Sequence, residues 1–196
     1  MASVVVAPSR CHWVSAQRPE ELVYHDQEWG VPVHDDRVFF EFLLLESAQA
    51  GLSWYTVLKK RAAYRRAFAE FDPLTVAGYD AQHIDRLVLD AGLIRHRGKL
   101  TAAIGNARVF CDIQREFGSF DAYVWRFVDG VPADGGRCSH ADVPVSSPAA
   151  EALSSDLNRR GCRFFGPTIA YAFMQATGLV NDHLVSCFRH REIARR

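Results

Sequence analysis

The chain has 196 residues, of which 48% are hydrophobic and 23% are charged, and its formal net charge at pH 7 is zero. This length supports one substantial core, so a single domain over residues 1–196 is expected. No stretch approaches the roughly 20 consecutive apolar residues that span a bilayer, which predicts a soluble protein without membrane association. The zero net charge argues against a surface uniformly coated in basic residues for nonspecific binding to nucleic acid.

Helical patterns follow one another along the chain. Asp35 and Asp36 begin a buried helix that ends near Gly51, and Ser53 caps a second helix whose apolar positions continue to Phe71. Further helices are predicted to begin at Asp72-Pro73 and at Asp80, and over 99–117, 120–128, 148–160, 167–177 and 182–187, with a loop over 129–147. The one weak strand pattern is Val4 to Val6, so the predicted class is all-α.

The turn over 91–98 joins two of these helices in a helix-hairpin-helix element over 81–110. Such a turn presents backbone N–H groups to a DNA phosphate, with Gly92 allowing the tight turn. Arg95, Arg97 and Lys99 would add positive charge and bind DNA without sequence preference. The turn departs from the commonest hairpin sequence, and a plain pair of packed helices is the alternative.

Two pairs of metal-binding residue types lie near the ends of the chain, Cys11 with His25 and His183 with Cys187. A Cys2His2 set is a standard tetrahedral zinc shell, and the spacing of His183 and Cys187 suits one helical turn. Four protein ligands leave no open position for water, so this zinc would join the two ends of the chain without catalysing a reaction. The alternative is a chance grouping of ordinary residues, since the chain has 8 histidines and 5 cysteines.

The cysteines and the first residues bear on location. The 5 cysteines are scattered without the regular spacing of a disulfide framework. The short apolar run from Val4 to Ala7 lacks the basic and longer apolar regions of a secretory signal. Both features predict a protein of the reducing cytoplasm, and a monomer is expected.

Longer blocks of sequence carry a resemblance to a known family. They read YHDQEWGVP from Tyr24, LESAQAGLSW from Leu45, DAGLIRHR from Asp90, FFGPT from Phe164 and GLVNDH from Gly178. With these blocks the chain resembles the bacterial DNA-3-methyladenine glycosylase I family of the helix-hairpin-helix superfamily. The resemblance implies flipping of 3-methyladenine out of alkylated double-stranded DNA and hydrolysis of its glycosidic bond, which leaves an abasic site and free 3-methyladenine. It also implies one structural zinc ion held by Cys11, His25, His183 and Cys187.

The same resemblance implies a pocket for the flipped base. Glu46 matches the pocket carboxylate, assigned here to catalysis and recognition, which accepts a hydrogen bond from the exocyclic amine and offers negative charge to a cationic ring. Tyr24 and Trp54 match aromatic residues that line the pocket, and Trp13 and Trp29 are expected to wall or buttress it. Without the resemblance, these aromatic residues would be interpreted as core and Glu46 as a surface carboxylate.

Two positions leave alternatives open. Leu52, on a turn between helices, is the candidate wedge that fills the gap left by the flipped nucleotide, although a buried staple is equally consistent. Relatives commonly carry an aromatic residue at the position of Glu21, so one stacking wall is missing or is replaced by a shifted Leu22, or Glu21 lies outside the pocket. The alternative functions are a related glycosylase for another small alkylated purine, and a zinc-stapled module that binds flipped or abasic sites without turnover.

The expected nucleophile is water. The only lysines are Lys59, Lys60 and Lys99, and none belongs to a pocket motif, which favours a monofunctional glycosylase over one that forms a Schiff base. Asp112 is the nearest aspartate after the hairpin, and it lies too far along the next helix to be assigned as the base.

Overall fold

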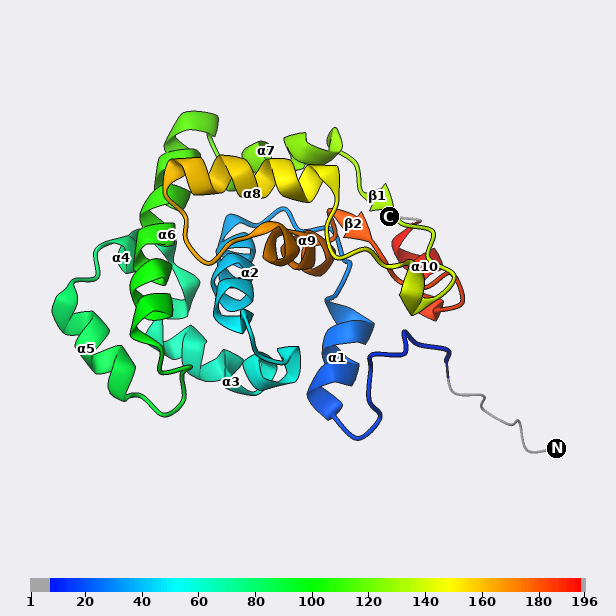
Figure 1. The fold of residues 1–196 in the computed structure, drawn as a ribbon, viewed down its shortest axis with the longest axis horizontal. Coiled ribbons are helices and arrows are strands. Elements are labelled where there is room, and N and C mark those ends of the chain that lie inside the picture. Colours follow the sequence, from blue (N-terminus) through cyan, green and yellow to red (C-terminus); the bar gives the residue numbers. More distant parts are fainter. Residues whose placement is uncertain (1–7, 195–196) are drawn as a thin grey trace.

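The protein is described by a computed structural model over residues 8–194, in which helices predominate (Figure 1). The α-helices are α1 (Pro19–Gln27), α2 (Asp36–Gln49), α3 (Trp54–Ala67), α4 (Pro73–Ala77), α5 (Ala81–Leu89), α6 (Arg97–Phe117), α7 (Phe120–Val124), α8 (Pro148–Arg160), α9 (Pro167–Ala176) and α10 (Phe188–Ile193). Short 3-10 helices lie at Ala69–Phe71, Trp125–Val128 and His140–Asp142. Among the described residues, no helix is both long enough and apolar enough to cross a membrane.

Helix α2 forms the centre of the core. Its side chains are buried continuously from Phe39 to Ala48, and the helix packs against α3, α6 and α9. In Figure 1 the other helices surround α2 and α9. Phe110 of α6 and Phe120 of α7 stack with ring centroids 4.2 Å apart beside this core. Burial on every side explains why α2 reads as a nearly continuous apolar run.

Predicted helix starts are confirmed by their capping bonds. The Asp35 carboxylate accepts hydrogen bonds from the N–H groups of Arg37 and Val38, and the Ser53 hydroxyl accepts from Thr56. These side chains satisfy backbone donors that have no partner within their own helices. The predicted extension of the second helix to Phe71 is wrong, because α3 ends at Ala67 and Ala69–Phe71 has positive φ angles.

Three further elements differ from the predictions. Strand β1 (Ala133–Asp134) pairs in parallel with β2 (Val180–Asn181), and α1 begins with Pro19 in its first turn; neither was predicted. The predicted helix over 182–187 is wrong, because this segment is a turn and α10 begins only at Phe188. The strand pattern at Val4 to Val6 lies outside the described residues.

The turn between α5 and α6 is tightly built. The Asp90 carboxylate accepts a hydrogen bond of 2.7 Å from the N–H of Gly92, and Leu93 is buried. A Cβ atom on residue 92 would lie 2.7 Å from the Cβ of Ala63, so the close approach to α3 requires glycine there. His96 then caps α6 by accepting from the N–H of Lys99 at 3.1 Å.

Candidate active site and metal centre

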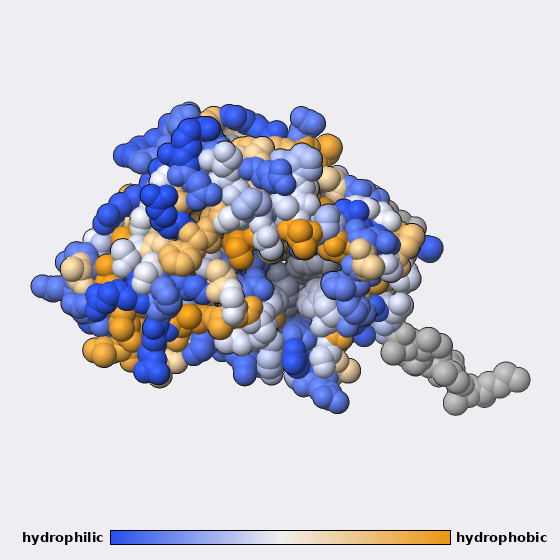
Figure 2. All heavy atoms as spheres, viewed as in Figure 1, coloured by the Kyte–Doolittle hydropathy of each residue, from blue (hydrophilic) through white to orange (hydrophobic). Residues whose placement is uncertain are grey.

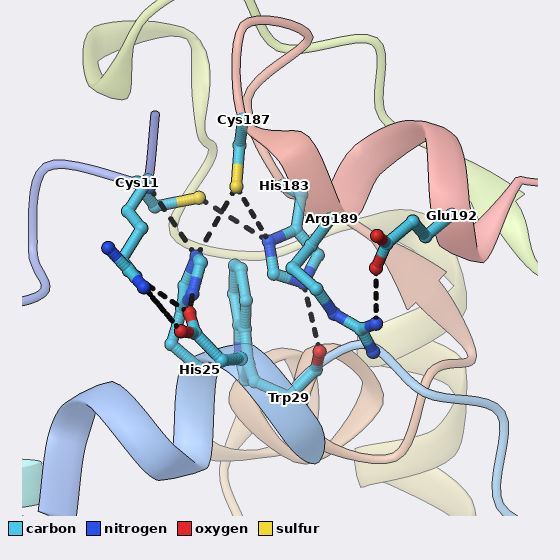
Figure 3. A network of polar contacts seen from close by, with 9 residues as sticks. Cys11, His25, Trp29, His183, Cys187, Arg189 and Glu192 are labelled. Carbon is cyan, nitrogen blue, oxygen red and sulfur yellow. Dashed lines mark hydrogen bonds and ion pairs between the residues drawn. The ribbon is translucent and has the colours of Figure 1, made fainter. Parts of the chain in front are cut away.

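The four residues proposed as metal ligands converge. The ligand atoms of Cys11, His25, His183 and Cys187 all lie within 4.8 Å of one another, and all four residues are buried (Figure 3). The Cys11 sulfur lies 3.5 Å from Nδ1 of His183, and the Cys187 sulfur lies 3.5 Å from Nε2 of His25. Zinc bonds of about 2.3 Å to sulfur and about 2.0 Å to nitrogen, at tetrahedral angles, separate these atoms by roughly 3.5 Å. The donor set therefore fits a four-coordinate zinc ion.

The outer nitrogen of each histidine has a partner that turns the other nitrogen toward the cluster. Nδ1 of His25 lies 2.8 Å from the Asp26 carboxylate, and Nε2 of His183 donates to the carbonyl oxygen of Trp29 at 2.9 Å (Figure 3). A hydrogen bond and ion pair with Arg10 lower the pKa of Asp26, so the carboxylate stays ionised. Partners of this kind fix the tautomer of metal-binding histidines.

The sulfur of Cys187 lies in an environment that favours a thiolate. A hydrogen bond from the Cys11 thiol lowers the pKa of Cys187. The thiolate is the form that binds a metal ion. Cys187 and His183 reach the cluster from a turn, with Cys187 at the N-cap of α10, and not from one helical face as predicted.

A pocket of about 330 Å³ lies next to the metal centre. Figure 2 shows the surface hollowed between α1 and α9. Its lining includes the side chains that the sequence assigned to base binding, namely Trp13, Tyr24, Trp29, Glu46 and Trp54. Cys11 also contributes to the lining, so the pocket and the metal centre share a wall.

Aromatic rings make up much of this lining. The ring of Tyr24 lies 5.2 Å from that of Trp54 and 6.3 Å from that of Trp13, between centroids. Trp13 in turn meets Trp29 edge to face at 5.2 Å. Burial, and then the neighbouring Glu46, raise the pKa of Tyr24 well above its usual value, so its hydroxyl stays protonated. Such rings suit a flat heterocyclic ligand.

Unpaired polar atoms mark the inner part of the pocket. Oε2 of Glu46 and the indole N–H of Trp54 are buried and have no hydrogen-bond partner within residues 8–194. Burial raises the pKa of Glu46 to about 8, because taking a carboxylate out of water disfavours its charged form. A buried polar atom without a partner costs about 1–3 kcal/mol. An acceptor and a donor left unpaired in one pocket indicate a ligand that supplies both partners.

Glu21 lies in the pocket wall. Its side chain is 6% exposed, accepts hydrogen bonds from the N–H of Ser15 and from Arg18, and contributes to the lining. The possibility that Glu21 lies outside the pocket is therefore wrong. A carboxylate paired with Arg18 occupies the position expected to carry an aromatic ring.

Comparison with known proteins identifies the family. Residues 13–190 match the model of the methyladenine glycosylase family. The chain is 51% identical to DNA-3-methyladenine glycosylase 1 of Escherichia coli (strain K12), over 91% of this chain and 95% of the relative. The chain belongs to the methyladenine glycosylase family.

Solved structures of family members have the same fold. A crystal structure of 3-methyladenine DNA glycosylase I superposes with a TM-score of 0.89 at 50% identity, covering 92% of this chain and 98% of the other. A second crystal structure is of a tyrosine-to-phenylalanine variant of 3-methyladenine DNA glycosylase I in complex with 3-methyladenine. It has a TM-score of 0.89 at 38% identity and covers 91% of this chain and 96% of the other.

The residues predicted to contact DNA do not line the pocket. Leu52 follows the end of α2 and is 41% exposed, so the alternative of a buried staple is wrong. Arg95 is exposed, and Arg97 pairs with Asp85 at 2.7 Å on the surface. Lys99 donates hydrogen bonds to the carbonyl oxygens of Ala48 and Ala50, which gives it a structural contact at the end of α2. Contact between these residues and DNA stays a prediction.

Some pocket residues were missed in the sequence. Tyr55 of α3, Gln175 of α9 and Asp182 also line the pocket. Asp182 belongs to the GLVNDH block, and its place beside His183 was the available signal. Nothing in a single sequence indicates that Gln175 and Tyr55 face the same cavity, because they lie on helices that meet only in the folded protein.

Proposed function

We propose that this protein removes 3-methyladenine from alkylated double-stranded DNA by hydrolysing its N-glycosidic bond, which leaves an abasic site. The observation that carries the proposal is the pair of unpaired atoms, Oε2 of Glu46 and the Trp54 N–H, inside an aromatic pocket. The exocyclic amine at the adenine edge supplies a donor to the Glu46 oxygen, and the flat purine ring suits the aromatic lining. The names of the relatives support the same substrate.

The chemistry of the substrate explains why the pocket carries so few catalytic groups. Methylation at N3 makes the base cationic, so the base is already a good leaving group. The enzyme must supply access and selection, and flipping a nucleotide costs a few kcal/mol. Glu46 accepts from the exocyclic amine and complements the positive ring, while Tyr24 and Trp54 hold its faces, with Trp13 and Trp29 behind them. Stacking contributes about 1–3 kcal/mol per base.

The proposed contact with DNA uses the helix-hairpin-helix element over 81–110. Arg95 and Arg97 beside the turn at Gly92 would meet the phosphate backbone, while the N–H of Gly92 is already bonded to Asp90 and gives the turn its shape. Leu52 would enter the duplex as the wedge that fills the space of the flipped nucleotide. The bonds from Lys99 to the end of α2 join α6 to the turn that carries Leu52, so both contacts would keep a fixed relative position.

The proposed cofactor is one structural zinc ion held by Cys11, His25, His183 and Cys187. When bound, the ion supplies a crosslink between distant segments and no reaction chemistry, since the four protein ligands complete its shell. Water would be the nucleophile, because the residues that line the pocket include no lysine. All five cysteines are free, which is consistent with a reducing cytoplasm, and we propose a monomer there.

The test is release of free base from alkylated duplex DNA, with the base identified by mass spectrometry. The proposal expects 3-methyladenine, an abasic site and no strand cleavage, and it expects little release by Glu46→Gln. Release of another alkylated purine in its place would favour the related glycosylase with a pocket altered at Glu21. Tight binding of abasic or damaged DNA without any release would favour the module that binds without turnover.

A further inference from the structure

A network of buried polar groups forms the pocket wall next to α9. Asp182 directly follows β2, lines the pocket and has a side chain that is 0% exposed. Its Oδ1 accepts from Arg137 at 3.0 Å, and its Oδ2 accepts from the Tyr171 hydroxyl at 2.5 Å. A Cβ atom on residue 135 would lie 2.0 Å from Oδ1 of Asp182, so only glycine there leaves space for the carboxylate. Asp182 is thus held from two sides.

The same carboxylate fixes the orientation of the Gln175 amide. Nε2 of Gln175 donates a hydrogen bond of 2.8 Å to Oδ2 of Asp182, and only the amide nitrogen of a glutamine side chain can donate. The amide nitrogen must therefore face Asp182, and the amide oxygen must point the other way. Burial raises the pKa of Tyr171 to about 12. The Tyr171 hydroxyl therefore stays protonated and remains a hydrogen-bond donor to Asp182.

The amide oxygen of Gln175 is left without a partner among the described residues, on a side chain that lines the pocket. Gln175 is half-buried and lines the pocket together with Glu46, and their helices α9 and α2 pack against each other. Across the part of the chain that the structure covers, Oε1 of Gln175 forms no hydrogen bond, whereas the amide nitrogen has its partner. The pocket therefore offers a neutral acceptor besides the Glu46 carboxyl.

We propose that Gln175 is a specificity-determining residue whose amide oxygen accepts a hydrogen bond from the exocyclic amine of the base, and that Asp182 is its positioning residue. The proposal rests on the proposed function, because it concerns recognition of the same base. An exocyclic amine carries two N–H groups, so Glu46 and Gln175 each accept one. A base with a carbonyl oxygen at that position would meet an acceptor that cannot turn, which is unfavourable.

The test compares the binding of two free bases, 3-methyladenine and 3-methylhypoxanthine, in which a carbonyl oxygen replaces the amine. Quenching of tryptophan fluorescence in the pocket reports both affinities without DNA or turnover. Gln175→Met keeps length and removes the acceptor, and it should reduce the preference for 3-methyladenine by about tenfold, the equivalent of one lost hydrogen bond. Asp182→Asn allows the amide to turn and should reduce the preference in the same direction, with the metal content measured alongside.

Tyr171→Phe is the matched control, because it removes one donor to Asp182 and leaves the carboxylate that orients Gln175. It should preserve the preference. Three outcomes would overturn the proposal. Gln175→Met could keep the parental preference, or it could lose affinity equally for both bases. Tyr171→Phe could change the preference as much as Gln175→Met does. Excision assays on the parent protein test the proposed function separately, because a parent that binds both bases without releasing any from DNA still reports the preference.

Discussion

The metal centre and the base pocket lie side by side and differ in how their polar groups are satisfied. In the metal centre, the ligand atoms face one another, and the outer nitrogens of His25 and His183 have partners of their own. In the pocket, Oε2 of Glu46 and the Trp54 N–H have none within residues 8–194. The first site is complete once an ion binds, which suits stability, and the second is incomplete until a ligand arrives.

Trp13 and Trp29 contact both the metal centre and the pocket. The carbonyl oxygen of Trp29 accepts from His183, while Trp29 also lines the pocket. The ring of Trp13 lies 5.4 Å from that of His25 and also faces the pocket. Changes at the metal centre should therefore disturb the pocket, whereas changes inside the pocket should leave the metal centre intact. The predictions below test this asymmetry.

The largest effect is expected from loss of the metal ion. Cys187→Ser should release zinc and lower the free energy of unfolding by several kcal/mol, because binding energy at a structural zinc site is folding energy. Metal analysis and thermal melting measure both changes. Cys138→Ser is the matched control, since Cys138 is exposed and lies outside the cluster. A metal-free protein with the melting temperature of the parent would show that the ion does not stabilise the fold.

The next effect concerns stability as a function of pH. Glu46 has its pKa raised from 4.5 to about 8 in the folded protein. The folded state therefore holds this proton more tightly, so the contribution of Glu46 to stability is complete below pH 4.5 and is lost as pH rises to about 8. Glu46→Gln remains neutral and should be more stable than the parent by a few kcal/mol at about pH 9, at about 1.4 kcal/mol per pKa unit. The two proteins should be nearly equal at about pH 5.

Urea unfolding at the two pH values measures the difference. The control is Glu151→Gln, at an exposed position, and it should have the same stability relative to the parent at both pH values. Equal stability of Glu46→Gln and the parent at the higher pH would mean that Glu46 has a partner or solvent access that the structure does not contain.

A smaller effect is expected on recognition. A cationic base favours the ionised form of Glu46, so Glu46→Gln preserves shape but removes a charged acceptor from the complex. Hydrogen bonds to charged groups are worth about 1.5–3 kcal/mol, or roughly ten- to a hundredfold in excision or free-base affinity. Trp54→Ala should weaken charged and neutral bases alike, because every base presents a π-face for stacking. Both variants should retain zinc. Excision by Glu46→Gln at the parental rate, with unchanged inhibition by free 3-methyladenine, would contradict the assignment of the pocket.

The comparison also explains which features could be predicted from the sequence. Helix starts at Asp35 and Ser53 follow from local capping chemistry, so they were correct. The pairing of Ala133–Asp134 with Val180–Asn181 could not be predicted, because two-residue strands have no periodicity. The turn that carries His183 was wrongly predicted as a helix, since a spacing of four residues fits both structures.

Within the pocket, Glu46 and the rings of Tyr24, Trp29 and Trp54 came from recognisable sequence blocks. The orientation of Gln175 did not, because it depends on a carboxylate that is fixed by Arg137 and Tyr171 from other parts of the chain. Glu21 was noticed in the sequence only as a departure from relatives. Its place in the wall depends on Arg18 and the backbone of Ser15, which became visible only in the folded chain.

The smallest effect should arise outside both sites, at the turn between α5 and α6. Arg95→Ala should weaken binding to damaged and undamaged DNA alike and reduce the slope of log affinity against log salt by about 1, because one phosphate contact is lost. Arg97→Ala should act in the same direction and more weakly, since Arg97 already pairs with Asp85. Arg115→Ala, at the other end of α6, is the matched control. If Arg95→Ala and Arg97→Ala both keep the parental salt slope, the turn between α5 and α6 does not face DNA. The DNA must then approach the pocket from another side of the protein.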